Sequence, residues 1–123
     1  MISEEPLGAA GIGGDKLREL LVLLTSEIRI LLGDRLQRIV LYGSYARGEE
    51  DKESDLDVMI FVNGSDDDLR QYREQVVDIE VDLSLKYDLV VSIILQAVDE
   101  YNKWLPVLPF FRNVQEEGVE VFG

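Results

Sequence analysis

The 123-residue sequence contains no cysteine and no histidine. Without cysteine it has no disulfide and no thiolate metal site, and without histidine it has no imidazole base or ligand. Basic residues are also scarce, because 12 Lys and Arg stand against 25 Asp and Glu, a formal net charge of -13. The electrostatic field of this negative net charge repels polyanions, so we expect no direct nucleic-acid binding and no attraction to an anionic membrane. Any acid–base or metal chemistry falls to carboxylates.

Long hydrophobic runs are missing too. No apolar stretch reaches the roughly 18 residues that a membrane-spanning helix requires, and the first residues, MISEEPLG, carry acids where a signal peptide carries bases. We therefore expect a cytoplasmic protein. With 46% hydrophobic and 30% charged residues, the chain fits one small domain with a modest core, which we place at residues 15–123. Residues 1–14, ending in GAAGIGG, are expected to be a flexible lead-in.

Hydrophobic spacing predicts a mixed α/β (α+β) fold, in which helices pack on a small mixed sheet of three to five strands. Asp15 is a candidate N-cap for the first helix and Gly33 a candidate C-terminal cap, while Ser65 and the three following aspartates suit the start of a later helix. We expect Leu85 to be buried in that later helix. The predicted strands are 36–42, 55–62, 89–96 and a short 119–122, and the predicted helices are 15–32, 66–87, 97–104 and 109–117.

Asp55 and Asp57 stand at the start of the apolar run DVMIFV, where a buried carboxylate is costly unless a cation lies against it. Residues two apart on a strand point to the same face, so these two carboxylates project together and repel each other. A divalent cation with oxygen ligands would relieve that repulsion, and Mg²⁺ is commonly held by carboxylates together with substrate phosphates. Upstream, Gly43 permits close backbone approach to a ligand, and Ser44 begins a short helix that suits a phosphate.

These residues together resemble a known signature. Gly43-Ser44, ten residues, and then Asp55-Leu56-Asp57, with Ala46-Arg47-Gly48 and Ser54 in between, are similar to the motif of the DNA polymerase beta nucleotidyltransferase superfamily. Within it, residues 36–96 resemble the minimal nucleotidyltransferase domain of antitoxins that partner HEPN-domain toxins. The resemblance implies a polymerase-beta-like nucleotidyltransferase fold.

The resemblance also implies roles for individual residues. Asp55 and Asp57 would be catalytic and would bind two Mg²⁺ ions, although Mn²⁺ accepts the same ligands. A third carboxylate on a later strand is expected as base or metal ligand, and Asp88-Leu89-Val90 matches its local pattern. Asp88 alternatively lies in a turn, with Ser92 at the equivalent depth of the strand. Glu80 and Asp82 fall within a helical pattern, where a solvated face is the ordinary explanation.

The nucleotide is expected to be ATP, bound by Gly43, Ser44, Arg47 and Ser54. For Arg47 two interpretations stay open, since its guanidinium either neutralises a phosphate or pairs with a neighbouring acid such as Glu49 or Glu50.

The implied activity is Mg²⁺-dependent transfer of AMP from ATP to a hydroxyl acceptor, most simply on a partner protein, as the antitoxin of a toxin–antitoxin pair. The partner would be a HEPN-type helical protein or a second copy of the chain. Two alternatives stay open: a non-catalytic nucleotide- or partner-binding module, and a transferase for a small hydroxylated molecule such as an aminoglycoside. An apolar cluster is either a docking patch or the edge of the core; it consists of Trp104, Leu105, Val107, Leu108, Phe110 and Phe111.

Overall fold

The computed structural model describes residues 13–123, so the expected lead-in lies almost wholly outside the described residues. Four strands form one sheet in the order β3-β2-β1-β4, in which β1 runs antiparallel to β2 and β4, and β2 runs parallel to β3. The predicted mixed sheet with packed helices is confirmed. The elements are α1 (Gly14–Leu32), a 3₁₀ turn (Gly33–Arg35), β1 (Leu36–Tyr42), α2 (Ser44–Arg47), β2 (Leu56–Val62), α3 (Asp66–Arg70), α4 (Arg73–Tyr87), β3 (Val91–Ala97), α5 (Val98–Trp104), α6 (Pro109–Glu117) and β4 (Val119–Phe122).

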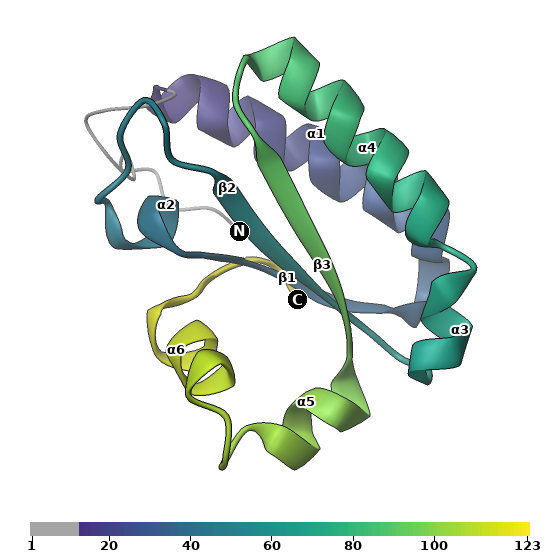
Figure 1. The fold of residues 1–123 in the computed structure, drawn as a ribbon. Coiled ribbons are helices and arrows are strands. Elements are labelled where there is room, and N and C mark those ends of the chain that lie inside the picture. The colour runs from purple at the N-terminus through teal and green to yellow at the C-terminus, as the bar shows by residue number, and fades with distance from the viewer. Residues whose placement is uncertain (1–12) are drawn as a thin grey trace.

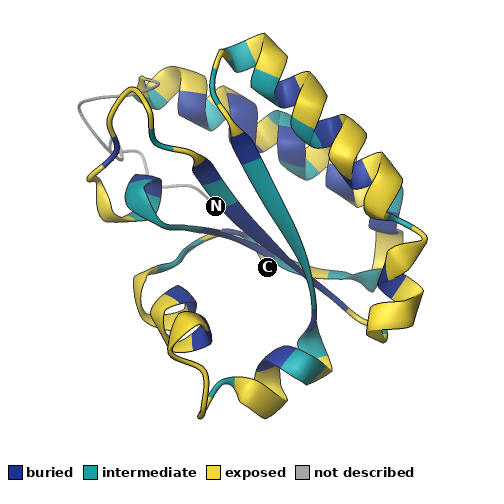
Figure 2. Ribbon diagram, in the orientation of Figure 1, coloured by how far each residue is buried: buried dark blue, intermediate teal, exposed yellow. Residues whose placement is uncertain are grey.

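The sheet has helices on both faces: α1 and α4 lie on one side, and α5 and α6 on the other (Figure 1). Strand alternation divides β2 between two cores. Leu56, Val58 and Ile60 join the larger core beneath α1 and α4, whereas Met59 and Phe61 join a smaller aromatic core with residues of α5 and α6. The central strands are accordingly buried, and the outer helix faces are exposed (Figure 2).

Helix α1 begins one residue before the expected position. Gly13, in an extended conformation, is its N-cap, while Asp15 lies in the first turn, where the helix dipole still favours its charge. The prediction that Asp15 is the N-cap of this helix is therefore wrong. Gly33 ends the helix as expected, with φ +56° and its N–H donating to Arg29 O. Among residues 13–123, no helix is long and apolar enough to cross a membrane.

The single helix expected over 66–87 is two helices. Ser65 and Asp68 form a capping box at the start of α3, which confirms a capping role there. The break follows at Gln71, whose side-chain amide donates to Asp68 O at 2.8 Å, while Tyr72 N–H bonds to Leu69 O only three residues back. These local bonds replace the α-helical ladder, and α4 starts afresh at Arg73.

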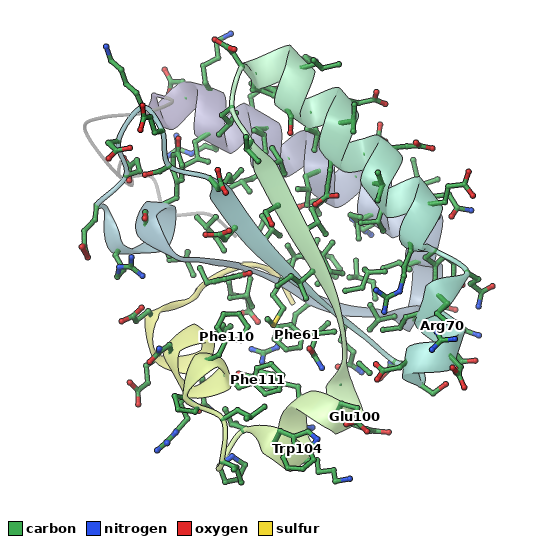
Figure 3. The ribbon with its side chains drawn as sticks, in the orientation of Figure 1. Phe61, Arg70, Glu100, Trp104, Phe110 and Phe111 are labelled. Carbon is green, nitrogen blue, oxygen red and sulfur yellow. The ribbon has the colours of Figure 1, made fainter. Side chains whose placement is uncertain are left out.

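Part of the C-terminal apolar cluster belongs to the core, and the rest of it is exposed. Phe111 is buried in the aromatic core, where its ring lies 4.9 Å from that of Tyr101, and Leu105 packs against the same core. Phe61, Phe110 and Phe111 gather between the sheet and α6, with Trp104 further away on α5 (Figure 3). The remaining large members of the cluster are 40–60% exposed, namely Trp104, Val107, Leu108 and Phe110.

Candidate active site

The two carboxylates lie at the end of β2 where the strand begins. Asp57 is half-buried in the strand, and its neighbours in the sheet are Tyr42 on β1 and Ser92 on β3. Asp55 is exposed and precedes the strand, which starts one residue later than expected at Leu56, whose N–H donates to Val90 O at 2.8 Å. Alternation puts Asp57 on the α5–α6 side of the sheet, in the same row as Met59.

The electrostatics of this end are unfavourable to negative charge. Burial raises the pKa of Asp57, the nearby charge of Asp55 raises it further, and Arg47 acts in the opposite direction. Burial, followed by the charge of Asp57, raises the pKa of Tyr42 to about 12. Both shifts disfavour negative charge at this end of the sheet, and a bound cation would act in the opposite direction.

Gly43 brings the chain close to Asp57. It has φ +75° and ψ -155°, a conformation that residues with a side chain rarely adopt. A Cβ atom at this position would collide with Asp57 Oδ2. The turn leads into the four-residue helix α2, Ser44–Arg47, whose C-cap, Gly48, is in the left-handed region. The Gly-Ser turn and the aspartate pair, ten residues apart in sequence, are therefore adjacent in space.

Arg47 connects α2 to α6. Its Nε donates to Glu49 Oε1 at 3.0 Å and its Nη1 to Glu117 Oε2 at 3.3 Å. The local partner Glu49 was among the two expected from the sequence. Glu117, seventy residues away, carries no sequence signal that could have revealed the contact. Beside this ion pair is a cavity of about 190 Å³, lined by Tyr42, Gly43, Arg47, Phe110, Asn113, Val114 and Glu117.

Ser54 organises the loop before the carboxylates. Its Oγ accepts from Asp51 N–H at 2.9 Å and donates to Asp51 Oδ1 at 3.3 Å. Asp51 Oδ1 also accepts from Glu53 N–H at 2.8 Å. The observed contacts of Ser54 thus shape the chain leading to Asp55, and its role toward a nucleotide stays a prediction.

Asp88 does not lie on the strand beside Asp57. It is the C-cap of α4, exposed and in the left-handed region at φ 55° and ψ 49°, where aspartate is tolerated better than most residues. Strand β3 begins three residues later, and Ser92 is the residue opposite Asp57. Within residues 13–123, no three Asp or Glu side chains lie close enough to hold a metal ion together. Of the two placements left open for Asp88, the structure has the turn, and a catalytic role for this residue stays a prediction.

Glu80 has a structural role that its helical pattern did not reveal. Its Oε2 accepts from Ile93 N–H at 2.6 Å, and Ser84 Oγ, one turn later, accepts from Val91 N–H at 2.9 Å. Strand β3 is at the edge of the sheet, so these N–H groups have no neighbouring strand. Two side chains of α4 thus satisfy the edge of β3. Asp82 is exposed, as expected.

The residues present fit a magnesium ion bound jointly with a nucleotide. Mg²⁺ keeps several waters and is usually held by one or two carboxylates plus substrate phosphates, so a complete protein cage is not required. Asp55 and Asp57 supply two carboxylates, and a cation beside them would oppose the burial and the Asp55 charge that raise the pKa of Asp57. The glycine at position 43 leaves room at Asp57 Oδ2 that any other side chain would fill.

Comparison with known proteins gives concordant results. A family model described as a nucleotidyltransferase domain matches residues 26–114. The chain is 36% identical over 103 residues to a candidate protein adenylyltransferase of Methanocaldococcus jannaschii, MJ0141, covering 84% of this chain and 96% of that protein. A second candidate from that organism, MJ0604, is 37% identical over 102 residues, 83% of this chain and 90% of the relative.

Among solved structures, a crystal structure of a toxin–antitoxin with AMP-PNP shares the fold. The TM-score is 0.56 with 19% sequence identity, and the match covers 84% of this chain and 73% of that chain.

Proposed function

Because this chain belongs to the nucleotidyltransferase domain family, we propose that it transfers AMP from ATP to a hydroxyl group of a partner protein, with Mg²⁺ as cofactor. One observation carries the proposal: Asp57 lies against the Gly43 turn and near Asp55, where burial and the charge of Asp55 raise its pKa. The names of the two relatives support protein adenylylation, and a structure of the same fold belongs to a toxin–antitoxin. We extend the proposal to an antitoxin role, and the resemblance seen in the sequence adds a HEPN-type helical protein as the proposed partner.

The chain's own residues position the reactants. Bound Mg²⁺ would be held by Asp55 and Asp57, and it supplies charge neutralisation for the triphosphate. The Gly43-Ser44 turn would let the phosphates approach the backbone. Arg47 lies one helical turn after Ser44, and its guanidinium is held by Glu49 and Glu117. The acceptor oxygen forms a bond to the α-phosphorus, the bond from the α-phosphorus to the bridging oxygen breaks, and pyrophosphate leaves while the hydroxyl proton passes to water.

The acceptor is assigned to another protein on grounds of size and charge. The cavity beside Arg47 measures about 190 Å³, and most of the chain is used for the sheet and its covering helices. A net charge of -13 favours association with a basic surface.

A non-catalytic binding module is the second candidate, and one observation favours it. Ser92, which cannot serve as a carboxylate base or ligand, occupies the β3 position opposite Asp57. In this case the carboxylate pair binds Mg-ATP, and the chain associates with its partner without modifying it.

The deciding experiment is transfer of label from α-phosphate-labelled ATP, with Mg²⁺, into a lysate of the source cells. Wild type is compared with Asp55→Asn/Asp57→Asn and with a matched control, Asp15→Asn/Asp34→Asn, which removes two exposed acids elsewhere. We expect a labelled protein with wild type and control but not with the site variant. Label confined to small molecules would support an aminoglycoside-type transferase instead. Binding of Mg-ATP without any labelling would support the non-catalytic module.

Asp88→Asn, run alongside, tests the third carboxylate. Full activity in this variant would show that Asp88 has no catalytic role and serves only in the turn after α4.

A further inference from the structure

Helix α4 is apolar on two opposite sides. Its inner side, formed by Val76, Ile79 and Leu83, is buried against the rest of the protein. Three further apolar residues at successive four-residue steps form one row on the outer side, which we name the outward stripe. Its members are Val77, Val81 and Leu85, with exposed fractions of 51%, 50% and 78%. The outer face of α4 is correspondingly exposed in Figure 2. The expectation that Leu85 is buried is therefore wrong, and the apolar row has no covering element within residues 13–123.

A second row runs beside the stripe. Glu74, Asp78 and Asp82 are also spaced four residues apart, and each lies three residues before a member of the stripe, so the two rows are neighbours on the helix surface. All three acids of this acidic row are exposed, and none forms a salt bridge with any residue of the 13–123 region. Like charges at four-residue spacing destabilise a helix slightly. An unpaired acidic row beside an uncovered apolar row is a surface that a partner would stabilise.

The stripe continues into a groove on the β3 side of the helix. A cavity of about 170 Å³ lies there, lined by Arg73, Val76, Val77, Glu80, Ile93 and Leu95. The edge of β3 is not open to an added strand at this place, because the N–H groups of Val91 and Ile93 already donate to Ser84 and Glu80. A partner at this surface would therefore contact side chains rather than pair with the backbone of β3.

We propose that the outward stripe and the acidic row dock a helix of another protein, one that carries an apolar row flanked by Lys or Arg. Apolar residues of that helix would cover Val77, Val81 and Leu85, and its basic residues would pair with Glu74, Asp78 and Asp82. A second copy of this chain fits poorly. Each copy carries a net charge of -13, and in an antiparallel pair of α4 helices the acidic rows would meet.

This surface is separate from the carboxylate pair. Helix α4 covers the sheet face opposite to the one that carries Asp57. A protein bound to α4 would leave the candidate active site uncovered. The proposed docking is therefore independent of whether the chain transfers a nucleotide.

The test is photo-crosslinking in the source cells, with a benzophenone amino acid in place of Val81. The matched control carries the same amino acid in place of Ile30, which is 86% exposed on α1. We expect one other protein to crosslink at position 81 and not at position 30, through a peptide whose sequence has helically spaced apolar residues beside Lys or Arg. Asp78→Lys/Asp82→Lys should reduce the product by about tenfold, because it places like charges against the partner.

Two further variants separate the outcomes. Glu74→Gln/Asp78→Asn/Asp82→Asn removes the three charges with side chains of nearly the same shape, and it should also weaken the crosslink. This variant tests the acidic row even if the lysine variant fails to fold. Asp55→Asn/Asp57→Asn should leave the product unchanged, which distinguishes docking from transfer. Absence of a product, the same product at position 30, a crosslink between two copies, or a product indifferent to charge reversal would overturn the proposal.

Discussion

Asp57 is the residue at which the stability of the fold and the proposed function conflict. Burial and the charge of Asp55 raise its pKa, so the native state binds a proton more readily than the unfolded chain. The free energy of unfolding then falls as pH rises from the unfolded pKa, about 3.9, through the raised folded pKa, and the penalty is fully present above it. At neutral pH, Asp57→Asn should therefore melt at the same temperature as wild type or slightly higher, while losing label transfer.

Thermal unfolding at neutral pH and below pH about 3.9 checks this, with Asp34→Asn as the exposed control. The advantage of Asp57→Asn should vanish at the acid end, where both states are protonated in wild type. A variant that is less stable than wild type at neutral pH, or one that keeps full transfer activity, contradicts the assignment.

Substitution of Gly43 separates the cost of a strained backbone from the cost of a collision with Asp57. Gly43→Ala introduces both a disfavoured backbone conformation and a collision with Asp57 Oδ2, and should cost about 1–3 kcal/mol of the free energy of unfolding. Gly33→Ala is the matched control, because φ is also positive there but no atom lies within 4 Å of the added Cβ. It should cost about 1–2 kcal/mol. Chemical denaturation measures both, and only Gly43→Ala should also abolish transfer; equal activity in the two variants would refute the close approach of the turn to Asp57.

At the scale of elements, the edge of β3 depends on α4. Glu80→Ala removes the acceptor of Ile93 N–H and should lower the free energy of unfolding by about 1–2 kcal/mol. Amide hydrogen exchange should become faster at Ile93, whereas Glu80→Gln, which retains an acceptor oxygen, should have a smaller effect. Asp82→Ala, an exposed acid two residues along the same helix, is the control. Unchanged protection of Ile93 in Glu80→Ala would show that the bond does not hold the strand.

The elements also show where sequence reasoning works and where it fails. The helix over 14–32 and the strands at 36–42 and 56–62 were predicted closely, because their apolar spacing and glycine boundaries are local signals. The break at Gln71 was missed, since it depends on one side chain bonding to Asp68 O in preference to solvent. The burial of Leu85 was predicted wrongly, because an apolar row on a helix does not reveal whether a neighbouring element covers it.

At the scale of the whole molecule, a charge of -13 on 123 residues repels itself. Raising NaCl from about 0.01 M to about 1 M shortens the screening length from about 30 Å to about 3 Å, so the melting temperature should rise. Glu74→Gln/Asp78→Asn/Asp82→Asn removes three of the negative charges and should melt higher than wild type at low salt, with the difference shrinking at high salt. Melting curves across the salt series check this, and a fall in melting temperature with NaCl would contradict it.

The sequence by itself determined the kinds of groups that this protein can use and the local structure that carries them. The lack of histidine and cysteine excludes imidazole and thiolate groups, and the Gly43-Ser44 turn and the Asp55-Leu56-Asp57 run were recognisable because their spacing is short. Only the tertiary structure decided which distant groups meet them. Strand register places Ser92 rather than Asp88 opposite Asp57, helix packing brings Glu117 to Arg47, and the position of α4 leaves Val81 uncovered. Such contacts depend on the pairing and packing of elements far apart in the chain, for which one sequence carries no local signal.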